Sequence, residues 1–276
     1  FRDFFARSRE NTVDYNPEHL ISPCDSLLSA YRITPESRFE IKHCTYSLES
    51  LLRDRPLAER YAGGLCLIFR LTPSHYHRYC YIDDGRRGDS FPLDGVLHSV
   101  RPMCIGSMPV FVENQREYTI LDTARFGRVI QVEVGALMVG KICNNPGQGR
   151  IRRGEEKGHF AFGGSTIILL LEPGRVQLNS EIFRRTARGQ ELPVRQGERI
   201  GTAPNEEQYK QAMAELENAK AVLAQHREDE IRFKTEAARA ARDVETETAN
   251  LVSLRDEKES ATKRLSGFVQ TADSAQ

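Results

Sequence analysis

The segment Gly163-Gly164-Ser165-Thr166 combines residue types that could cleave their own peptide chain. Glycine adopts backbone conformations that other residues avoid, so the carbonyl of Gly164 could turn toward the hydroxyl of Ser165. A neighbouring base could activate that hydroxyl to attack the carbonyl, which would convert the peptide into an ester. β-Elimination would then release the upstream fragment as a carboxylate and leave dehydroalanine at the new N-terminus. Hydrolysis of this residue, with loss of ammonia, would give a pyruvoyl group, an electrophilic ketone. The alternative for these four residues is a plain turn before a strand.

Two histidines, His75 and His77, are separated by one residue. On a strand, their side chains would point to the same face. Such a pair could bind a metal ion. Because no third ligand stands at a suitable spacing, we expect no metal site, and the alternative is a pair of histidines without a chemical role.

The first two hundred residues have the composition of short strands separated by turns. The expected strands are Leu28–Ile33, Phe39–His43, Leu65–Leu71, Pro109–Val112, Tyr118–Leu121, Val129–Val134 and Ser165–Leu171. The last of them is continuously apolar, which predicts a central strand buried on both faces. Helical patterns occur at Ser47–Asp54 and Leu57–Tyr61. The pattern therefore predicts an α+β fold that is rich in β-strands and contains minor helices.

The composition changes near Pro204, which predicts a domain over residues 1–202 and a tail over 203–276. Asn205, with Gln208 three positions later, is a plausible helix N-cap. From there to Ser266 the chain contains neither glycine nor proline, which predicts a long helix or a helical hairpin. The apolar residues approximate a heptad, at Met213, Leu216, Leu223, Val244, Leu251, Leu254, Ala261 and Leu265. A coiled coil that joins chains, a hairpin packed on the body, and a fusion junction near Pro204 are the alternatives.

The net charge of the chain is zero, with 39 basic and 39 acidic side chains, so no global field favours nucleic acid as a partner. Residues 1–202 carry a formal charge of +4, and the tail carries a formal charge of −4. The positive charge of residues 1–202 suits an anionic lipid surface. The six scattered cysteines indicate neither a zinc site nor a disulfide framework. The longest apolar run, Ile167–Leu171, is far too short to span a bilayer.

Several motifs precede Gly163 in a fixed order. They are Phe1–Arg7, Ile21–Ser26, Ser74–Arg78, Val112–Glu117, Val132–Gly140 and Arg153–Gly158. In kind, order and spacing, these motifs and the Gly-Gly-Ser-Thr segment resemble the phosphatidylserine decarboxylase family. The resemblance covers residues 1–202 and does not extend into the tail.

The resemblance implies a compact sandwich-like catalytic domain that cleaves itself between Gly164 and Ser165. It implies a covalent pyruvoyl cofactor derived from Ser165, which replaces pyridoxal as the electron sink for converting phosphatidylserine to phosphatidylethanolamine. The expected partners are phosphatidylserine, an anionic membrane surface and the two cleaved fragments of the chain, which stay together. We also expect peripheral association with the cytoplasmic side of the cell membrane, and the tail could form a homo-oligomer.

The family motifs also imply roles for individual residues. Asp25 falls on an acid that orients and charge-stabilises the base, and His77 falls on a histidine that handles the substrate during decarboxylation. Cys80 departs from the pattern, because it stands where the family has the histidine that activates the serine. Three candidates remain for that base: His77, His98, and Cys80 as a thiolate. The alternative function is a degenerate relative that does not process itself and acts through lipid binding or a coiled coil.

Overall fold

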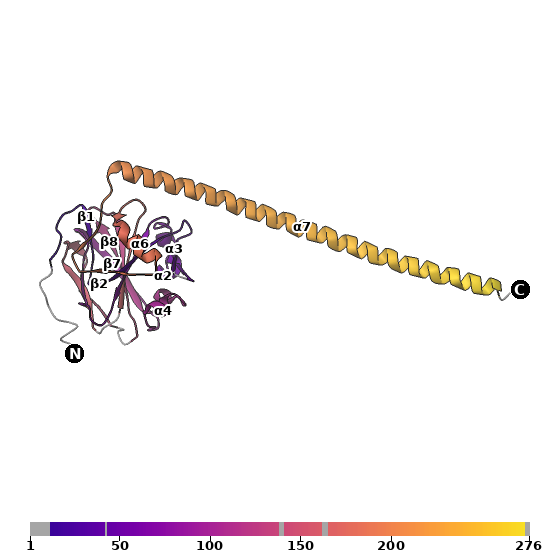
Figure 1. Cartoon of the computed structure of the whole chain (residues 1–276), viewed down its shortest axis with the longest axis horizontal. Coiled ribbons are helices and arrows are strands. Elements are labelled where there is room, and N and C mark those ends of the chain that lie inside the picture. The colour runs from indigo at the N-terminus through magenta and orange to yellow at the C-terminus, as the bar shows by residue number, and fades with distance from the viewer. Residues whose placement is uncertain (1–11, 42, 138–140, 162–164, 274–276) are drawn as a thin grey trace. The chain divides into compact units, whose positions relative to one another are not determined.

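The centre of the fold is β13 (Ser165–Leu171), a strand whose seven residues are all buried. The computed structural model describes residues 12–41, 43–137, 141–161 and 165–273 (Figure 1). In an antiparallel sheet, β13 pairs with β5 on one side and with β9 on the other. This placement confirms the prediction of a central strand from the continuous apolar run.

The main sheet has eight strands in the order β11-β7-β8-β9-β13-β5-β2-β15. Their bounds are Gly149–Ile151, Gly85–Leu93, Arg116–Thr123, Arg128–Val134, Ser165–Leu171, Leu65–Leu71, Ser26–Arg32 and Leu192–Val194. Three smaller sheets complete the domain: β10 (Ile142–Asn144) with β12 (Glu156–Phe160) and β6 (Arg78–Cys80); β1 (His19–Ile21) with β16 (Arg199–Thr202) and β14 (Gln177–Leu178); and β3 (Arg38–Ile41) with β4 (Cys44–Ser47).

Each face of the main sheet has its own apolar core. Ile167 and Leu169 pack on one face with residues of the two three-stranded sheets, such as Tyr79 and Phe160. Ile168 and other alternate residues pack on the opposite face with β3, β4 and several short helices. The resulting layers confirm an α+β fold rich in β-strands. Because side chains alternate along a strand, Ser165 lies on the same face of the sheet as Ile167.

The short helices are α2 (Leu48–Leu52), α3 (Arg55–Glu59), α4 (Pro102–Ile105), α5 (Val110–Glu113) and α6 (Ser180–Ala187). The first two confirm the predicted helical patterns, and side chains of Ser47 and Asp54 cap them. The predicted strand Pro109–Val112 is wrong: this segment forms the single helical turn α5, which buries Val110 and Phe111 in the core.

The tail forms one helix, α7 (Glu206–Asp273), rather than a hairpin. Its N-terminus confirms the predicted cap: the Gln208 N–H donates to Asn205 Oδ1 at 2.8 Å, and the Asn205 N–H donates to Gln208 Oε1 at 3.0 Å. The chain divides into two compact units, one that ends at Ala219 and one that begins at Lys220. The first turns of α7 thus belong to the first unit, where Leu216 is buried against Gly63. No helix in the described part of the chain is long and apolar enough to cross a membrane.

Candidate functional site

Ser165 is the first residue of β13, and its side chain is fully buried. It pairs with Leu71, the last residue of β5, and its neighbour Thr166 pairs with Val134, the last residue of β9. Among the described residues, the Ser165 hydroxyl has no hydrogen-bond partner. A buried hydroxyl without a partner is costly, so this atom is the first candidate for a chemical role. The predicted cleavage position at Gly164 lies outside the described residues.

The loop that follows Leu71 carries His75, which the sequence argument left without a role. Its Nδ1 atom accepts a hydrogen bond of 2.8 Å from the Thr72 backbone N–H. A backbone N–H can only donate, so the neutral ring carries its proton on Nε2. Burial lowers the pKa of His75, although the nearby Asp25 carboxylate acts in the opposite direction. His75 is therefore a neutral donor rather than a base.

His77 has the opposite tautomer. Its ring is fully buried, and Nδ1 lies 2.9 Å from the carbonyl oxygen of His75. A carbonyl can only accept, so Nδ1 carries the proton and Nε2 keeps the lone pair that a general base requires. The His77 carbonyl accepts a hydrogen bond from the Phe160 N–H at 3.0 Å. This bond holds the backbone of His77 beside Phe160 at the end of β12.

Asp25 comes immediately before β2, at the same end of the sheet as Ser165. The strand register pairs Leu27 of β2 with Arg70 of β5, so the start of β2 lies beside the end of β5. The Asp25 carboxylate is largely buried, and its Oδ1 accepts a hydrogen bond of 2.9 Å from the Gln196 N–H. We call this edge, where β13 and β2 begin and β5 and β9 end, the Ser165 end of the sheet.

Cys80 lies at the end of β6 and is almost completely buried. Burial raises the pKa of its thiol to about 12, although the side chain of Gln196 acts in the opposite direction. A thiol with this pKa is protonated at neutral pH, so the geometry does not favour a thiolate base. The Cys80 N–H donates to the Pro23 carbonyl at 2.9 Å, which fixes the loop that carries Asp25.

His98 also lies at the Ser165 end, but it belongs to the far side of β9. Its carbonyl accepts hydrogen bonds from the Leu137 N–H and from the Asn114 side chain. Its Nε2 atom is 3.0 Å from Glu113 Oε2, and the side chain is 37% exposed. Ser165, His77 and Asp25 are thus each buried at the same end of the sheet, whereas the ring of His98 is directed to a surface carboxylate.

A buried ion pair lies next to Ser165. Lys157 Nζ is 2.8 Å from each carboxylate oxygen of Glu133, and both side chains are fully buried. Glu133 pairs with Ile167 across the sheet, so it shares the face of Ser165; such a diagonal neighbour lies about 7–8 Å away. Burial raises the pKa of Glu133 and lowers that of Lys157, while their mutual attraction opposes both shifts. Asn144 bonds to both partners and completes the cluster.

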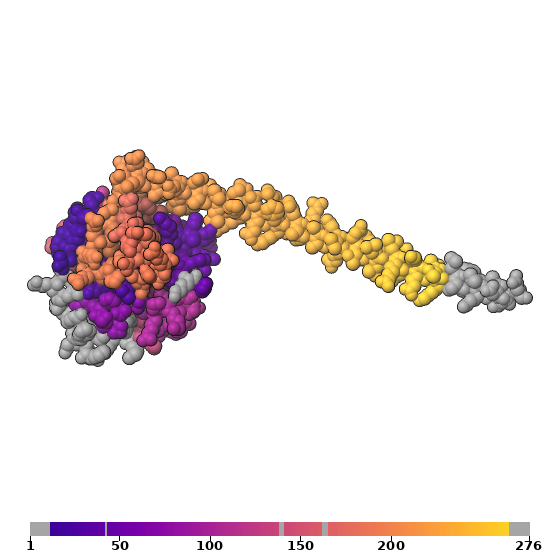
Figure 2. Space-filling model, in the orientation of Figure 1, coloured from indigo at the N-terminus to yellow at the C-terminus, as the bar shows by residue number. Residues whose placement is uncertain are grey.

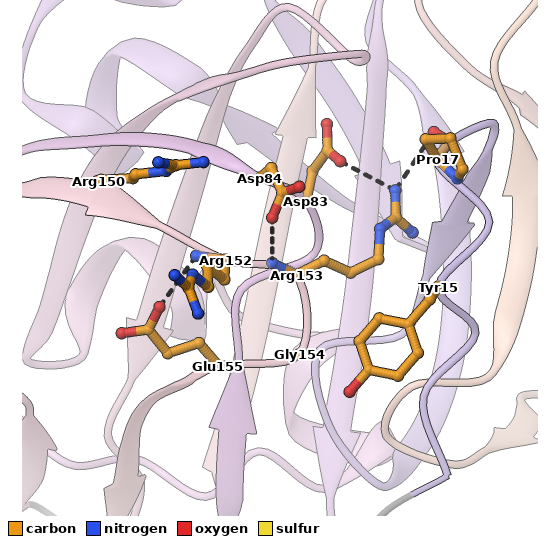
Figure 3. A pocket seen from close by; sticks show the side chains of 9 residues that line it. All are labelled: Tyr15, Pro17, Asp83, Asp84, Arg150, Arg152, Arg153, Gly154 and Glu155. Atoms are coloured by element: carbon orange, nitrogen blue, oxygen red, sulfur yellow. Dashed lines mark hydrogen bonds and ion pairs between the residues drawn. The ribbon is translucent and has the colours of Figure 1, made fainter.

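A cavity of about 830 Å³ lies away from this chemistry (Figure 3). Arg150 lines it from β11, next to the beginning of β7, and this edge is opposite the Ser165 end of the sheet. Arg153 is committed to protein partners, because it donates to Asp83 Oδ1 at 2.9 Å and to the His19 carbonyl at 2.6 Å. These contacts hold the guanidinium of Arg153 against β1 and the Asp83 carboxylate.

Sequence reasoning missed Gln196 and the buried ion pair. The Arg116 guanidinium is buried and donates to four carbonyls, including those of Leu51 and Ser50, so it is a structural residue. Gln196 reaches Asp25 across 171 positions of sequence, and no local signal marks it. In the described ranges, no three side chains of metal-ligating type come together.

The site is a buried serine at the start of the central strand of a β-rich domain. Two glycines precede this serine in the sequence, and a buried histidine and a buried carboxylate lie at the same end of the sheet. A family model described as phosphatidylserine decarboxylase matches residues 1–202. The chain is 44% identical to phosphatidylserine decarboxylase proenzyme 2 of Clostridium acetobutylicum over 204 residues, which cover 73% of this chain and 70% of that protein.

A phosphatidylserine decarboxylase proenzyme of Clostridium novyi is 43% identical over 209 residues, and one of Clostridium perfringens is 41% identical over 207 residues. Both alignments cover 73% of this chain and 70% of the relative. The chain belongs to the phosphatidylserine decarboxylase family.

Proposed function

We propose that the chain is a proenzyme that cleaves itself between Gly164 and Ser165 and then converts phosphatidylserine to phosphatidylethanolamine. Family membership and relatives named as proenzymes support this function. The observation that carries it is the buried Ser165 hydroxyl, which has no hydrogen-bond partner among the described residues and begins the central strand. Conversion of this serine to a pyruvoyl group would also remove the buried donor.

We propose that His77 is the base that activates Ser165. Its Nε2 lone pair would accept the hydroxyl proton as Ser165 Oγ bonds to the Gly164 carbonyl carbon. The peptide C–N bond then breaks, and the proton passes to the released amine. Asp25 would stabilise the positive charge that His77 gains in between. The fixed tautomer of His77 and the high pKa of Cys80 both support this assignment.

After cleavage, the pyruvoyl carbonyl would supply the electron sink for loss of carbon dioxide from the serine head group. The residues of the chain would provide the rest. His77, as the family motif implies, would handle the substrate during decarboxylation. His75 presents an Nε2–H that can donate a hydrogen bond at the same loop. The buried setting of the site would exclude water and strengthen these interactions.

Phosphatidylethanolamine formation tests this function. We expect purified protein to release carbon dioxide from phosphatidylserine in mixed micelles, and we expect hydroxylamine to stop the reaction by blocking the carbonyl. The Ser165→Ala variant has no source of a pyruvoyl group and should be inactive. Activity that is equal in Ser165→Ala and wild type would contradict the proposal.

A lipid substrate requires the site to reach a membrane, and we propose that the Ser165 end of the sheet docks there peripherally. Val96, Met103 and Leu137 are exposed by 52%, 82% and 60% and come from segments near this end. The Val96 carbonyl bonds to the Gln115 N–H, and the Gln115 carbonyl bonds to Gly135, which follows the end of β9.

Two exposed cations near this surface would attract anionic head groups. Arg101 and Lys141 are exposed near these apolar side chains. Of the acidic side chains at this edge, Glu113 contacts His98, while Asp94 is exposed. Cations attract anionic head groups while apolar side chains enter the interface.

Vesicle co-sedimentation tests the docking surface. We expect stronger binding to vesicles that contain phosphatidylserine than to phosphatidylcholine alone. Changing Met103 and Leu137 together to Asp should weaken binding by about tenfold or more, because two exposed apolar side chains are lost from the interface. The control is Tyr15→Asp, which removes a side chain that is 72% exposed and lines the cavity at the opposite end. An equal loss in both variants would contradict a specific docking surface.

A further inference from the structure

The second compact unit, which begins at Lys220, is a single helix with apolar side chains in water. Phe233, Val244, Leu251 and Leu254 are each 61–66% exposed. Figure 2 shows this orange-to-yellow segment as side chains around one helix. Exposed large apolar residues that recur along a long helix indicate a partner surface. The family match ends at residue 202, so this surface belongs to a part of the chain that the family does not explain.

These residues follow a heptad repeat. The a positions are 223, 230, 237, 244, 251 and 258, and the d positions are 226, 233, 240, 247, 254 and 261. Over the stretch from Phe233 to Leu254, every a and d residue is apolar except Glu247. An apolar a/d stripe is the seam of a coiled coil.

The charged residues beside the stripe are sorted by sign. The g positions carry Asp229, Glu236, Asp243 and Glu257, with neutral residues at 222 and 250. The e positions carry Arg227, Lys234 and Arg255, with neutral residues at 241, 248 and 262. No basic residue stands at g and no acidic residue at e within this segment.

This separation of charge between the e and g positions determines which helix can pair with this one and whether the two run parallel. In a parallel pair, each g residue faces an e residue of the other helix, so acids meet bases or neutral residues. In an antiparallel pair of identical helices, g faces g and e faces e, so like charges meet. Asp229 of one chain would face Lys234 of the other only in the parallel arrangement. A second copy of the same chain therefore complements this surface by itself.

We propose that residues 220–264 form a parallel, in-register, two-stranded coiled coil with a second copy of this chain. Two strands fit the charged residues Glu230 and Lys258 at a positions, because long side chains reach water from the narrow seam of a dimer. In register, Glu230, Glu247 and Lys258 each face their own copy, and these like charges weaken the pair. Each catalytic domain is joined to the N-terminal end of its helix, so the parallel coil brings two active sites to the same end.

Sedimentation equilibrium of the whole protein tests the pairing. We expect a reversible dimer of twice the 31.3 kDa chain mass. Leu251→Asp places a charge at an a position and should weaken the dimer by about tenfold or more. The matched control is the next residue: Val252 is 55% exposed but lies at a b position, so Val252→Asp should leave the dimer intact.

Charge reversal tests the direction. In the parallel dimer, Asp229→Lys and Lys234→Asp should each weaken association, and the double variant should restore it. An antiparallel pair would instead be strengthened by either single change. A monomer at every concentration, a trimer, or equal effects of Leu251→Asp and Val252→Asp would overturn the proposal. Cleavage at Ser165 is measured separately in each variant, so failure here leaves the proposed activity untouched.

Discussion

Replacing His77 with alanine is expected to slow cleavage between Gly164 and Ser165 by about 10²–10⁴-fold, the usual cost of losing a general base. Nε2 of His77 carries the lone pair because Nδ1 donates to the His75 carbonyl. His98→Ala should change the rate little, because that ring contacts Glu113. A gel time course of freshly purified protein measures all of these rates.

The controls separate chemistry from folding. His77→Asn keeps a side-chain N–H for the His75 carbonyl but has no base, so it should fold and remain uncleaved. Cys80→Ala should be cleaved at nearly the wild-type rate, since a thiol with a pKa of about 12 is protonated at neutral pH. If His77→Ala is cleaved normally while Cys80→Ala or His98→Ala is not, the assignment of the base is wrong.

Removing Lys157 is expected to destabilise the fold by about 3–5 kcal/mol, because Glu133 would be left buried and unpaired. Both side chains are fully buried and lie next to the start of β13. Replacing the pair together, by Lys157→Met with Glu133→Leu, should restore most of this loss, since apolar residues of similar volume need no counter-charge. Urea unfolding in the uncleaved Ser165→Ala background measures the free energies.

The matched control for this prediction is Lys141→Ala, which removes an exposed lysine near the same end of the sheet and should cost little. A loss in Lys157→Ala no larger than in Lys141→Ala would contradict the expected cost of an unpaired buried charge. A double variant as unstable as Lys157→Ala would show instead that the pair contributes through shape rather than charge.

Part of the fold was predictable from patterns among residues that are close in sequence. The run Ser165–Leu171 has no polar residue after Thr166, a pattern typical of a strand buried on both faces. The cap of α7 forms between Asn205 and Gln208, which are close in sequence. The strand β7 was not predicted, because Gly85–Leu93 contains charges, glycines and a proline without apolar alternation. Pairing with β8 overrides this composition.

The site was predictable only in its residue types. Ser165, Asp25 and His77 stand in motifs, so their positions could be chosen before the structure was known. The tautomers of His75 and His77 depend on which backbone groups their rings meet, and no sequence spacing reveals that. The contacts between Glu133 and Lys157, and between Gln196 and Asp25, depend on the register of strands that are distant in sequence.

The mass of the purified protein tests the central proposal most directly. Cleavage after Gly164 divides the 276-residue chain into fragments of 164 and 112 residues. We predict that denaturing mass spectrometry finds both, that the smaller fragment has the mass of a pyruvoyl terminus and no free α-amine, and that Ser165→Ala gives one intact chain. A wild-type protein that stays at its full mass after prolonged incubation would contradict self-processing and would favour a relative that acts without it.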